Sequence, residues 1–174
     1  MQKRDNAVTF KGNPKSLFGP ALKAGDKAPD FKCLNQGLAF VTLADTPAKA
    51  RLFSVVPSLD TPVCSVQTKK FEEGVKALGD SVACYTVSLD MPFAQKRFCS
   101  GEGLSSMQTL SDVHDQSFGK QFGVLLDGLP LALLARSVFV VDASGTISYV
   151  EIVPEVTSEP NYENALAALK AAVR

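Results

Sequence analysis

One segment of the chain contains both a strand pattern and a helix start: Leu52-Phe53-Ser54-Val55-Val56-Pro57-Ser58-Leu59-Asp60-Thr61-Pro62-Val63-Cys64. Residues 52–56 predict a buried strand, and Pro57 closes it. Pro62 suits the first position of a helix, whose apolar residues then recur at Phe71, Val75 and Leu78. The next run, 81–89, is rich in β-formers and predicts an interior strand. This order predicts a parallel βαβ unit.

Further elements extend this unit in both directions along the chain. Downstream, the patterns predict helices at about 92–99 and 161–173, a hairpin of 137–141 with 146–153, and short elements at 107–110 and 115–122. Upstream, residues 8–11 and 15–18 flank a turn at 12–14, and short strands are expected at 30–34 and 38–43. The sequence thus predicts the α/β class: a thioredoxin-like three-layer sandwich with an N-terminal β-hairpin extension, with 1–174 as a single domain.

Composition narrows the class of partner. The chain has 174 residues, of which 45% are apolar and 21% charged, and 18 basic residues balance 18 acidic ones. This balance offers no basic surface, so we expect neither nucleic acid nor an anionic membrane as a partner. The N-terminus lacks an apolar leader, and Pro130 and Arg136 interrupt the longest apolar stretch, so we expect a cytoplasmic protein without a transmembrane segment.

Of the four cysteines, Cys64 has the most reactive predicted environment. Thr61 is a plausible N-cap and Pro62 the first helical residue, so Cys64 falls in the first turn. Unpaired backbone N–H groups and the helix dipole favour an anion there, and the thiolate is the reactive form of cysteine. The alternative is that Cys64 serves only as a small buried hydrophobe.

Cys99 ends the helix pattern that begins at Pro92. On a helical wheel Phe93, Ala94 and Phe98 define the apolar face, and Cys99 falls nearly opposite its centre. The glycine-containing run 100–103 follows, which we expect to let the helix end fray and carry Cys99 to a partner. The alternative is an incidental exposed thiol.

The other two cysteines and the single histidine are not expected to take part in a reaction. Cys84 lies in the middle of the interior strand and Cys33 beside early apolar residues, so packing is the expected role of both. His114, the only histidine, is expected in a solvated loop or at a helix start. No two cysteines have the close spacing typical of zinc sites, and no Cys-x-x-Cys motif of a dithiol oxidoreductase occurs.

At these residues the sequence resembles the peroxiredoxin family, and within it the bacterial thiol peroxidases of the atypical two-cysteine type. Two segments carry the resemblance: Pro57-x-x-x-Thr61-x-x-Cys64 and Asp90-x-Pro92-Phe93-Ala94-Gln95-x-Arg97-Phe98-Cys99. The family usually approaches its active-site arginine through Gly-Pro-Leu-x-Gly-Leu-x-Ala-Arg, whereas residues 128–136 read Gly-Leu-Pro-Leu-Ala-Leu-Leu-Ala-Arg. The proline at a different position and the missing second glycine imply a different loop shape. Arg136 still matches the family's arginine.

The resemblance implies a role for each of these residues. Cys64 would attack a hydroperoxide, hydrogen peroxide or an alkyl or lipid hydroperoxide, and become a sulfenic acid. Thr61 and Arg136 would donate hydrogen bonds to the sulfur and the peroxide, and Pro57 would shield the sulfenate from solvent. Cys99 would then form an intramolecular Cys64–Cys99 disulfide, which thioredoxin would reduce. The family further implies a homodimer, and it implies no metal or bound cofactor.

The geometry of a disulfide predicts that both helix ends move during this cycle. A disulfide needs Cα atoms within about 7 Å, so two thiols on separate helices require local unfolding of both helix ends. Two rival functions use the same fold: a thiol-disulfide oxidoreductase, and a non-enzymatic thioredoxin-like binding module in which the cysteines only pack.

Overall fold

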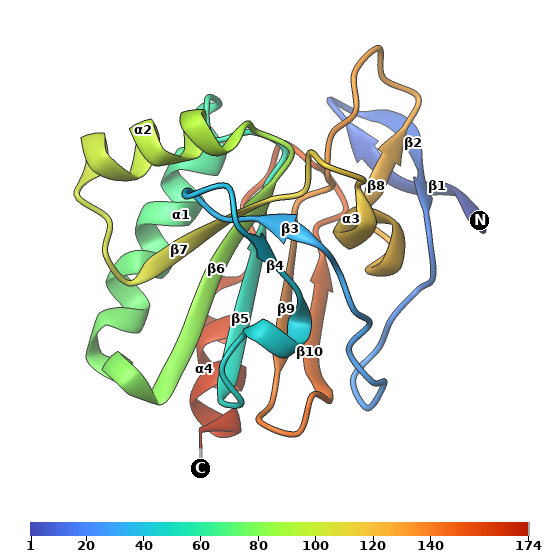
Figure 1. Ribbon diagram of the computed structural model, residues 1–174. Coiled ribbons are helices and arrows are strands. Elements are labelled where there is room, and N and C mark those ends of the chain that lie inside the picture. The colour runs from blue at the N-terminus through green and yellow to red at the C-terminus, as the bar shows by residue number, and fades with distance from the viewer. Residues whose placement is uncertain (174) are drawn as a thin grey trace.

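The computed structural model describes residues 1–173, and these residues form two sheets (Figure 1). The larger sheet has the strand order β10-β9-β5-β6-β7-β3-β4, and the smaller one the order β1-β2-β8. The strands of the larger sheet are β3 (Cys33–Leu34), β4 (Phe40–Val41), β5 (Ala50–Val55), β6 (Val82–Ser88), β7 (Met107–Ser111), β9 (Ser137–Val141) and β10 (Ile147–Ile152). Those of the smaller sheet are β1 (Lys3–Phe10), β2 (Asn13–Phe18) and β8 (Leu125–Asp127).

The parallel βαβ unit predicted from residues 52–64 is present. Strand β5 pairs in parallel with β6, and β6 in parallel with β7. Helix α1 (Pro62–Val75) connects the first pair and α2 (Pro92–Glu102) the second, with 3-10 turns at Lys76–Ser81 and Leu43–Asp45. Strand β9 runs antiparallel to β5 and forms the predicted hairpin with β10.

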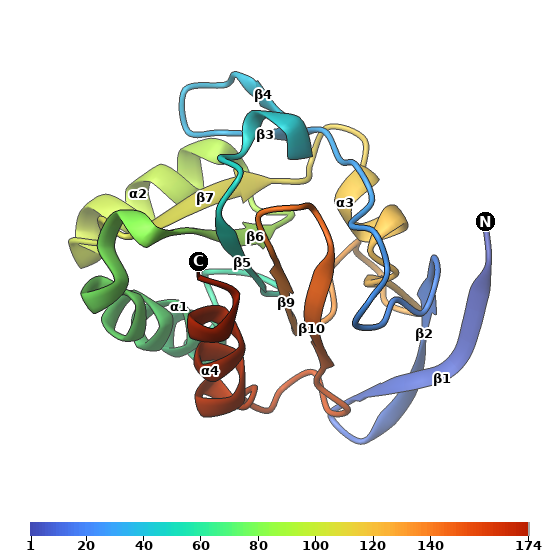
Figure 2. The same ribbon diagram turned by 90° about the horizontal axis from the view of Figure 1, so that it is seen from below.

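Layers cover both faces of the larger sheet (Figure 2). On one face, α1 and α4 (Tyr162–Ala172) bury Phe71 and Leu169 against apolar residues of β5, β6 and β9. On the other face, α3 (Ser117–Gln121) and the smaller sheet cover an aromatic cluster in which Phe118 stacks on Phe122 with ring centroids 4.1 Å apart. These layers confirm the thioredoxin-like sandwich with its N-terminal hairpin. None of the helices within 1–173 has the length and apolarity to cross a membrane.

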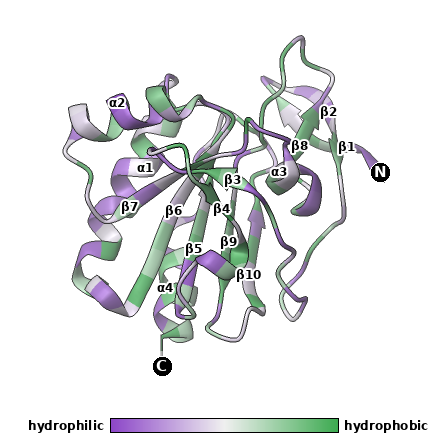
Figure 3. Ribbon diagram, in the orientation of Figure 1, coloured by the Kyte–Doolittle hydropathy of each residue, from purple (hydrophilic) through white to green (hydrophobic). Residues whose placement is uncertain are grey.

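Strand β8 was not predicted. It has three residues, too few for a periodic pattern, and it forms because β2 offers it antiparallel partners from Ser16 to Phe18. Figure 3 shows the contrast between the apolar central strands and the hydrophilic stretches of α1 and α2. Short edge elements therefore depend on distant partners, while the central strands are evident from their own residues.

The orientation predicted for α2 is wrong. The residues that α2 buries are Pro92, Gln95 and Cys99, whereas Phe93 is 61% exposed. Helix α2 crosses the ends of β6 and β7, where polar groups need partners, and the buried amide of Gln95 donates to Ser88 Oγ at 3.1 Å. The Gln95 amide also donates to the Leu110 carbonyl at 3.1 Å. These two bonds hold this face of α2 against the sheet, so Cys99 lies on the inner face of the helix.

Candidate active site

Cys64 lies in the first turn of α1, as predicted, after the loop that connects β5 to this helix. Thr61 has the extended backbone of an N-cap residue, Pro62 begins the helix, and Cys64 has 0% exposed surface. The first intrahelical bond runs from Ser65 N–H to the Thr61 carbonyl at 3.1 Å, so the N–H groups before Ser65 have no partner within the helix. These N–H groups favour negative charge at the start of the helix.

The structure brings Arg136 to Cys64 across 72 positions of sequence. Arg136 Nη2 donates to Cys64 Sγ at 3.3 Å, and the guanidinium is 2% exposed. Its Nε donates to the Val156 carbonyl at 2.7 Å. A cation held this close, away from bulk water, stabilises a thiolate more strongly than an exposed cation does.

Gln67 is a site residue that sequence reasoning missed. It lies one turn after Cys64 on the same buried face of α1, and its Oε1 accepts from Arg136 Nη1 at 2.9 Å. Its Nε2 donates to Ser54 Oγ on β5 at 2.8 Å. The amide thus fixes the guanidinium against helix and sheet, and an uncharged polar residue three positions after Cys64 is the signal that could have revealed it.

Asp90 is a second missed residue, although it belongs to the quoted Cys99 motif. Its carboxylate accepts from Ser58 Oγ at 2.7 Å and from Leu59 N–H at 2.8 Å. Since Asp90 lies two residues before Pro92, the first residue of α2, it joins the loop before Cys64 to the start of the helix that carries Cys99.

The Thr61 hydroxyl does not make the hydrogen bond to Cys64 that was predicted for it. Its side chain is exposed, its hydroxyl donates to the Ser58 carbonyl at 2.8 Å, and it makes no side-chain capping bond. The hydroxyl proton is therefore used within the loop and is directed neither at Cys64 nor at a helix N–H. The Thr61 N–H donates to the same Ser58 carbonyl at 3.1 Å, so a tight turn from Ser58 to Thr61 places the hydroxyl at this acceptor.

A pocket of about 500 Å³ opens in front of this site. Most of its lining is apolar and comes from four parts of the chain: Phe10, Pro57, Pro62, Val63, Leu131, Leu133 and Val156, with Lys11, Ser58, Thr61, Arg136 and Thr157 as the polar members. Pro57 is buried in this wall. The pocket can admit a small molecule with an apolar body and bring it to the guanidinium beside Cys64.

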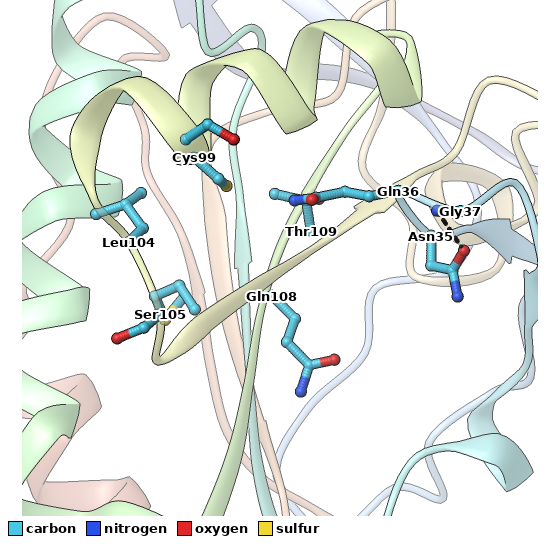
Figure 4. A pocket seen from close by; sticks show the side chains of 10 residues that line it. Asn35, Gln36, Gly37, Cys99, Leu104, Ser105, Gln108 and Thr109 are labelled. Atoms are coloured by element: carbon cyan, nitrogen blue, oxygen red, sulfur yellow. Dashed lines mark hydrogen bonds between the residues drawn. The ribbon is translucent and has the colours of Figure 1, made fainter.

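Cys99 lies elsewhere, on the inner side of α2, and is 7% exposed instead of standing free in solvent. Figure 4 shows its side chain directed from α2 toward Thr109 and Gln36, along a pocket of about 410 Å³. Burial raises the pKa of the Cys99 thiol; a hydrogen bond with Gln36 lowers it less, and the charge of Glu72 raises it further. Cys64 and Cys99 are both free thiols here. Helix α2 also continues through the run expected to fray and ends at Gly103, in the left-handed conformation.

The other sequence candidates lie away from this site. Cys33 is buried and donates to Asp112 Oδ1 at 3.6 Å, and burial raises the pKa of the buried Cys84 to about 12. His114 is exposed and contacts the Phe40 ring edge to face. Within residues 1–173 no group of three or more His, Cys, Asp or Glu side chains is arranged to hold a metal ion.

The chain is similar to known proteins over nearly its whole length. A family model described as Redoxin matches residues 23–166. The thiol peroxidase of Halalkalibacterium halodurans is 53% identical over 167 residues, covering 96% of this chain and 99% of that protein. The thiol peroxidase of Bacillus subtilis is 49% identical over 167 residues, covering 96% and 98%. A peroxiredoxin-like protein from Aquifex aeolicus, 39% identical, superposes with a TM-score of 0.89 over 97% of this chain and 98% of that one.

Proposed function

Since the chain belongs to the peroxiredoxin family, with thiol peroxidases as full-length relatives, it reduces hydroperoxides with a thiol, and we propose that Cys64 is the attacking sulfur. The observation that carries this assignment is the buried contact of Cys64 Sγ with Arg136 Nη2 at 3.3 Å. The full-length relatives decide against the two rivals, a thiol-disulfide oxidoreductase and a non-enzymatic binding module.

In the proposed reaction the Cys64 thiolate attacks the terminal oxygen of the hydroperoxide. The S–O bond forms as the O–O bond breaks, so sulfur is oxidised by two electrons to a sulfenic acid. The leaving oxygen takes a proton and departs as an alcohol or water. Arg136 stabilises the charge as it moves from sulfur to the leaving oxygen, and Gln67 holds the guanidinium in place.

Thr61 and Pro57 complete this site in our proposal. The Thr61 hydroxyl lines the pocket and would turn from the Ser58 carbonyl to a bound peroxide, since a hydroxyl rotates freely to suit its partner. Pro57 excludes water from the wall of the pocket. The apolar lining supports alkyl and lipid hydroperoxides as substrates beside hydrogen peroxide.

We assign the second half of the cycle to Cys99. Its sulfur attacks the Cys64 sulfenic acid, forming an S–S bond and releasing water. Because Cys99 is buried on α2 and directed toward Gln36 and Thr109, the helix ends must unfold locally before the two sulfurs meet. A dithiol protein of the thioredoxin class then reduces the disulfide by exchange. We further propose a homodimer, as the family implies, that acts in the cytoplasm.

A coupled assay tests these roles. Peroxide-dependent NADPH oxidation is followed with thioredoxin and thioredoxin reductase for the wild type, Cys64→Ser and Cys99→Ser, with Cys84→Ala as a control in another buried free thiol. We expect Cys64→Ser to abolish turnover, Cys99→Ser to stop cycling after one sulfenic acid per chain, and Cys84→Ala to remain active. Undiminished turnover in Cys64→Ser would end the assignment, and normal cycling in Cys99→Ser would remove the resolving role. Mass spectrometry of the oxidised, unreduced digest shows directly which sulfurs are joined.

A further inference from the structure

A buried carboxylate on α1 holds the segment that follows Cys99. Glu72 is 3% exposed, and its two oxygens accept from the backbone N–H groups of three successive residues, the last two before β7 and the first of β7. Oε1 accepts from Ser105 and Ser106, each at 2.9 Å, and Oε2 accepts from Ser106 at 3.0 Å and Met107 at 2.7 Å. The turn that leads from α2 into β7 is therefore built around this carboxylate.

The charge of Glu72 is stabilised by this turn. Burial disfavours the ionised form, but the hydrogen bonds from Ser105, Ser106 and Met107 outweigh it and hold the pKa of Glu72 below its ordinary value. Hydrogen bonds to an ionised acceptor are about twice as strong as neutral ones. Glu72 therefore ties the turn more tightly than an uncharged side chain of the same size would.

A second contact joins the same two helices. Lys69, one turn before Glu72 on α1, forms an ion pair with Glu102 at the end of α2, with Nζ and Oε2 2.8 Å apart. Helix α1, which carries Cys64, thus holds the end of α2 beside Cys99 at two points. Figure 1 shows α1 and α2 adjacent, with the α2–β7 turn beside α1.

These contacts oppose the movement that the catalytic cycle requires. Cys99 is buried and unpaired while α2 is folded, so its half of α2 must open to reach Cys64. Opening separates Lys69 from Glu102. It also breaks the bond that Leu104 N–H, next to the Glu72-bound Ser105, donates to the Cys99 carbonyl at 3.1 Å. The strength of both contacts adds to the free energy of opening.

We propose that Glu72 is a positioning residue that keeps the Cys99 segment folded and so sets the rate at which the Cys64 sulfenic acid becomes a disulfide. This inference rests on the proposed function of Cys64 and Cys99. While the segment is closed, a second hydroperoxide can oxidise the sulfenate by two electrons to a sulfinate, transferring one oxygen and leaving as an alcohol. Glu72 therefore also sets the sensitivity to over-oxidation.

The test compares Glu72→Gln with Glu73→Gln. Gln replaces one carboxylate oxygen by an NH₂ group that cannot accept from the turn. Glu73 is the matched control, because its side chain is 80% exposed and pairs only with the neighbouring Lys76 in the structure. Reduced protein is mixed with tert-butyl hydroperoxide and quenched at intervals. Mass spectrometry then separates thiol, trapped sulfenic acid, disulfide and sulfinate.

We expect Glu72→Gln to form the disulfide roughly tenfold faster, the size expected for a weakened hydrogen bond to a charged group. The rate of sulfenic acid formation should stay within about twofold of the wild type, and sulfinate should fall. A merely structural role would slow both steps together. Loss of the Glu72 charge, which raises the pKa of the Cys99 thiol, could speed the disulfide step by itself, so Glu72→Gln must also exchange the amides of Ser105, Ser106 and Met107 faster than the wild type does. Glu73→Gln should match the wild type, and a disulfide rate in Glu72→Gln no faster than in Glu73→Gln would overturn the inference.

Two further measurements keep the inference testable if Glu72→Gln folds poorly. Lys69→Gln removes only the half-exposed ion pair, and we expect it to raise the disulfide rate by roughly twofold. In the wild type, the amides of Ser105, Ser106 and Met107 should exchange hydrogen more slowly than those of α2; faster exchange would refute the anchor. If Cys64 forms no sulfenic acid in the wild type, it is instead the proposed function that fails.

Discussion

Replacing Arg136 with Gln removes the cation beside Cys64 and tests whether that cation speeds the attack of Cys64 on a peroxide. The guanidinium makes three hydrogen bonds, to Cys64 Sγ, to Gln67 Oε1 and to the Val156 carbonyl. Loss of one preorganised donor to a developing charge costs roughly 10²–10³ in rate, or about 3–4 kcal/mol. We therefore expect the rate constant for peroxide attack on Cys64 to fall by roughly that factor.

The same substitution has a cost in stability that must be separated from the effect on rate. Gln67 Oε1 and the Val156 carbonyl lose their donor, and an unsatisfied buried group costs about 1–3 kcal/mol. Arg51→Gln is the matched control: Arg51 is also buried, at 4% exposure, and donates to Thr46 Oγ1 and the Asp142 carbonyl far from Cys64. It should lower the free energy of unfolding and leave the attack rate unchanged.

The assay is a single turnover of reduced protein with tert-butyl hydroperoxide at neutral pH. Arg136→Lys, which keeps the charge without the planar fork, should lie between wild type and Arg136→Gln. An attack rate reduced less than about fivefold in a folded Arg136→Gln protein would refute the electrostatic role.

Two other outcomes follow from buried polar groups. Gln67→Leu leaves Arg136 without its anchor on α1, so single-turnover peroxide attack should slow by roughly tenfold, and an unchanged rate would remove the positioning role. Burial raises the pKa of Asp112 to about 6, whereas a carboxyl in an unfolded chain has a pKa of about 4. The folded state therefore holds this proton more tightly, and its stability should gain about 1 kcal/mol from Asp112 as the pH falls from 7 to 5. Urea unfolding at both pH values should show this gain in the wild type and not in Asp112→Asn; equal pH dependence in the two would contradict it.

Several features of the fold could be predicted because their signals are local. Residues 52–64 contain a fully buried strand and a proline-initiated helix, and each is specified by residues a few positions apart. The position of Cys64 in the first turn follows from the same residues. The motif around Cys99 likewise placed this cysteine near the end of α2, although its orientation was predicted incorrectly.

Other features required the packed molecule. The burial of Cys99 depends on polar groups of β6 and β7 that attract Gln95, so the helical periodicity of α2 alone was misleading. Strand β8 exists only because β2 pairs with it. The hydrogen bonds that Glu72 accepts come from backbone N–H groups more than thirty positions away. Every residue except proline has such a group, so the pattern of side chains cannot indicate which ones Glu72 binds.

The amino-acid sequence alone specified the central βαβ unit and placed a thiol at a helix start, because propensity, capping and periodicity act over a few neighbouring residues. The family resemblance already implied that Arg136 contacts that thiol. Only the tertiary structure determined that Gln67 and Asp90 hold the surrounding groups and that Cys99 is buried on the inner face of its helix. Those contacts depend on the strand order of the sheet, which brings together side chains and backbone groups that are distant along the chain.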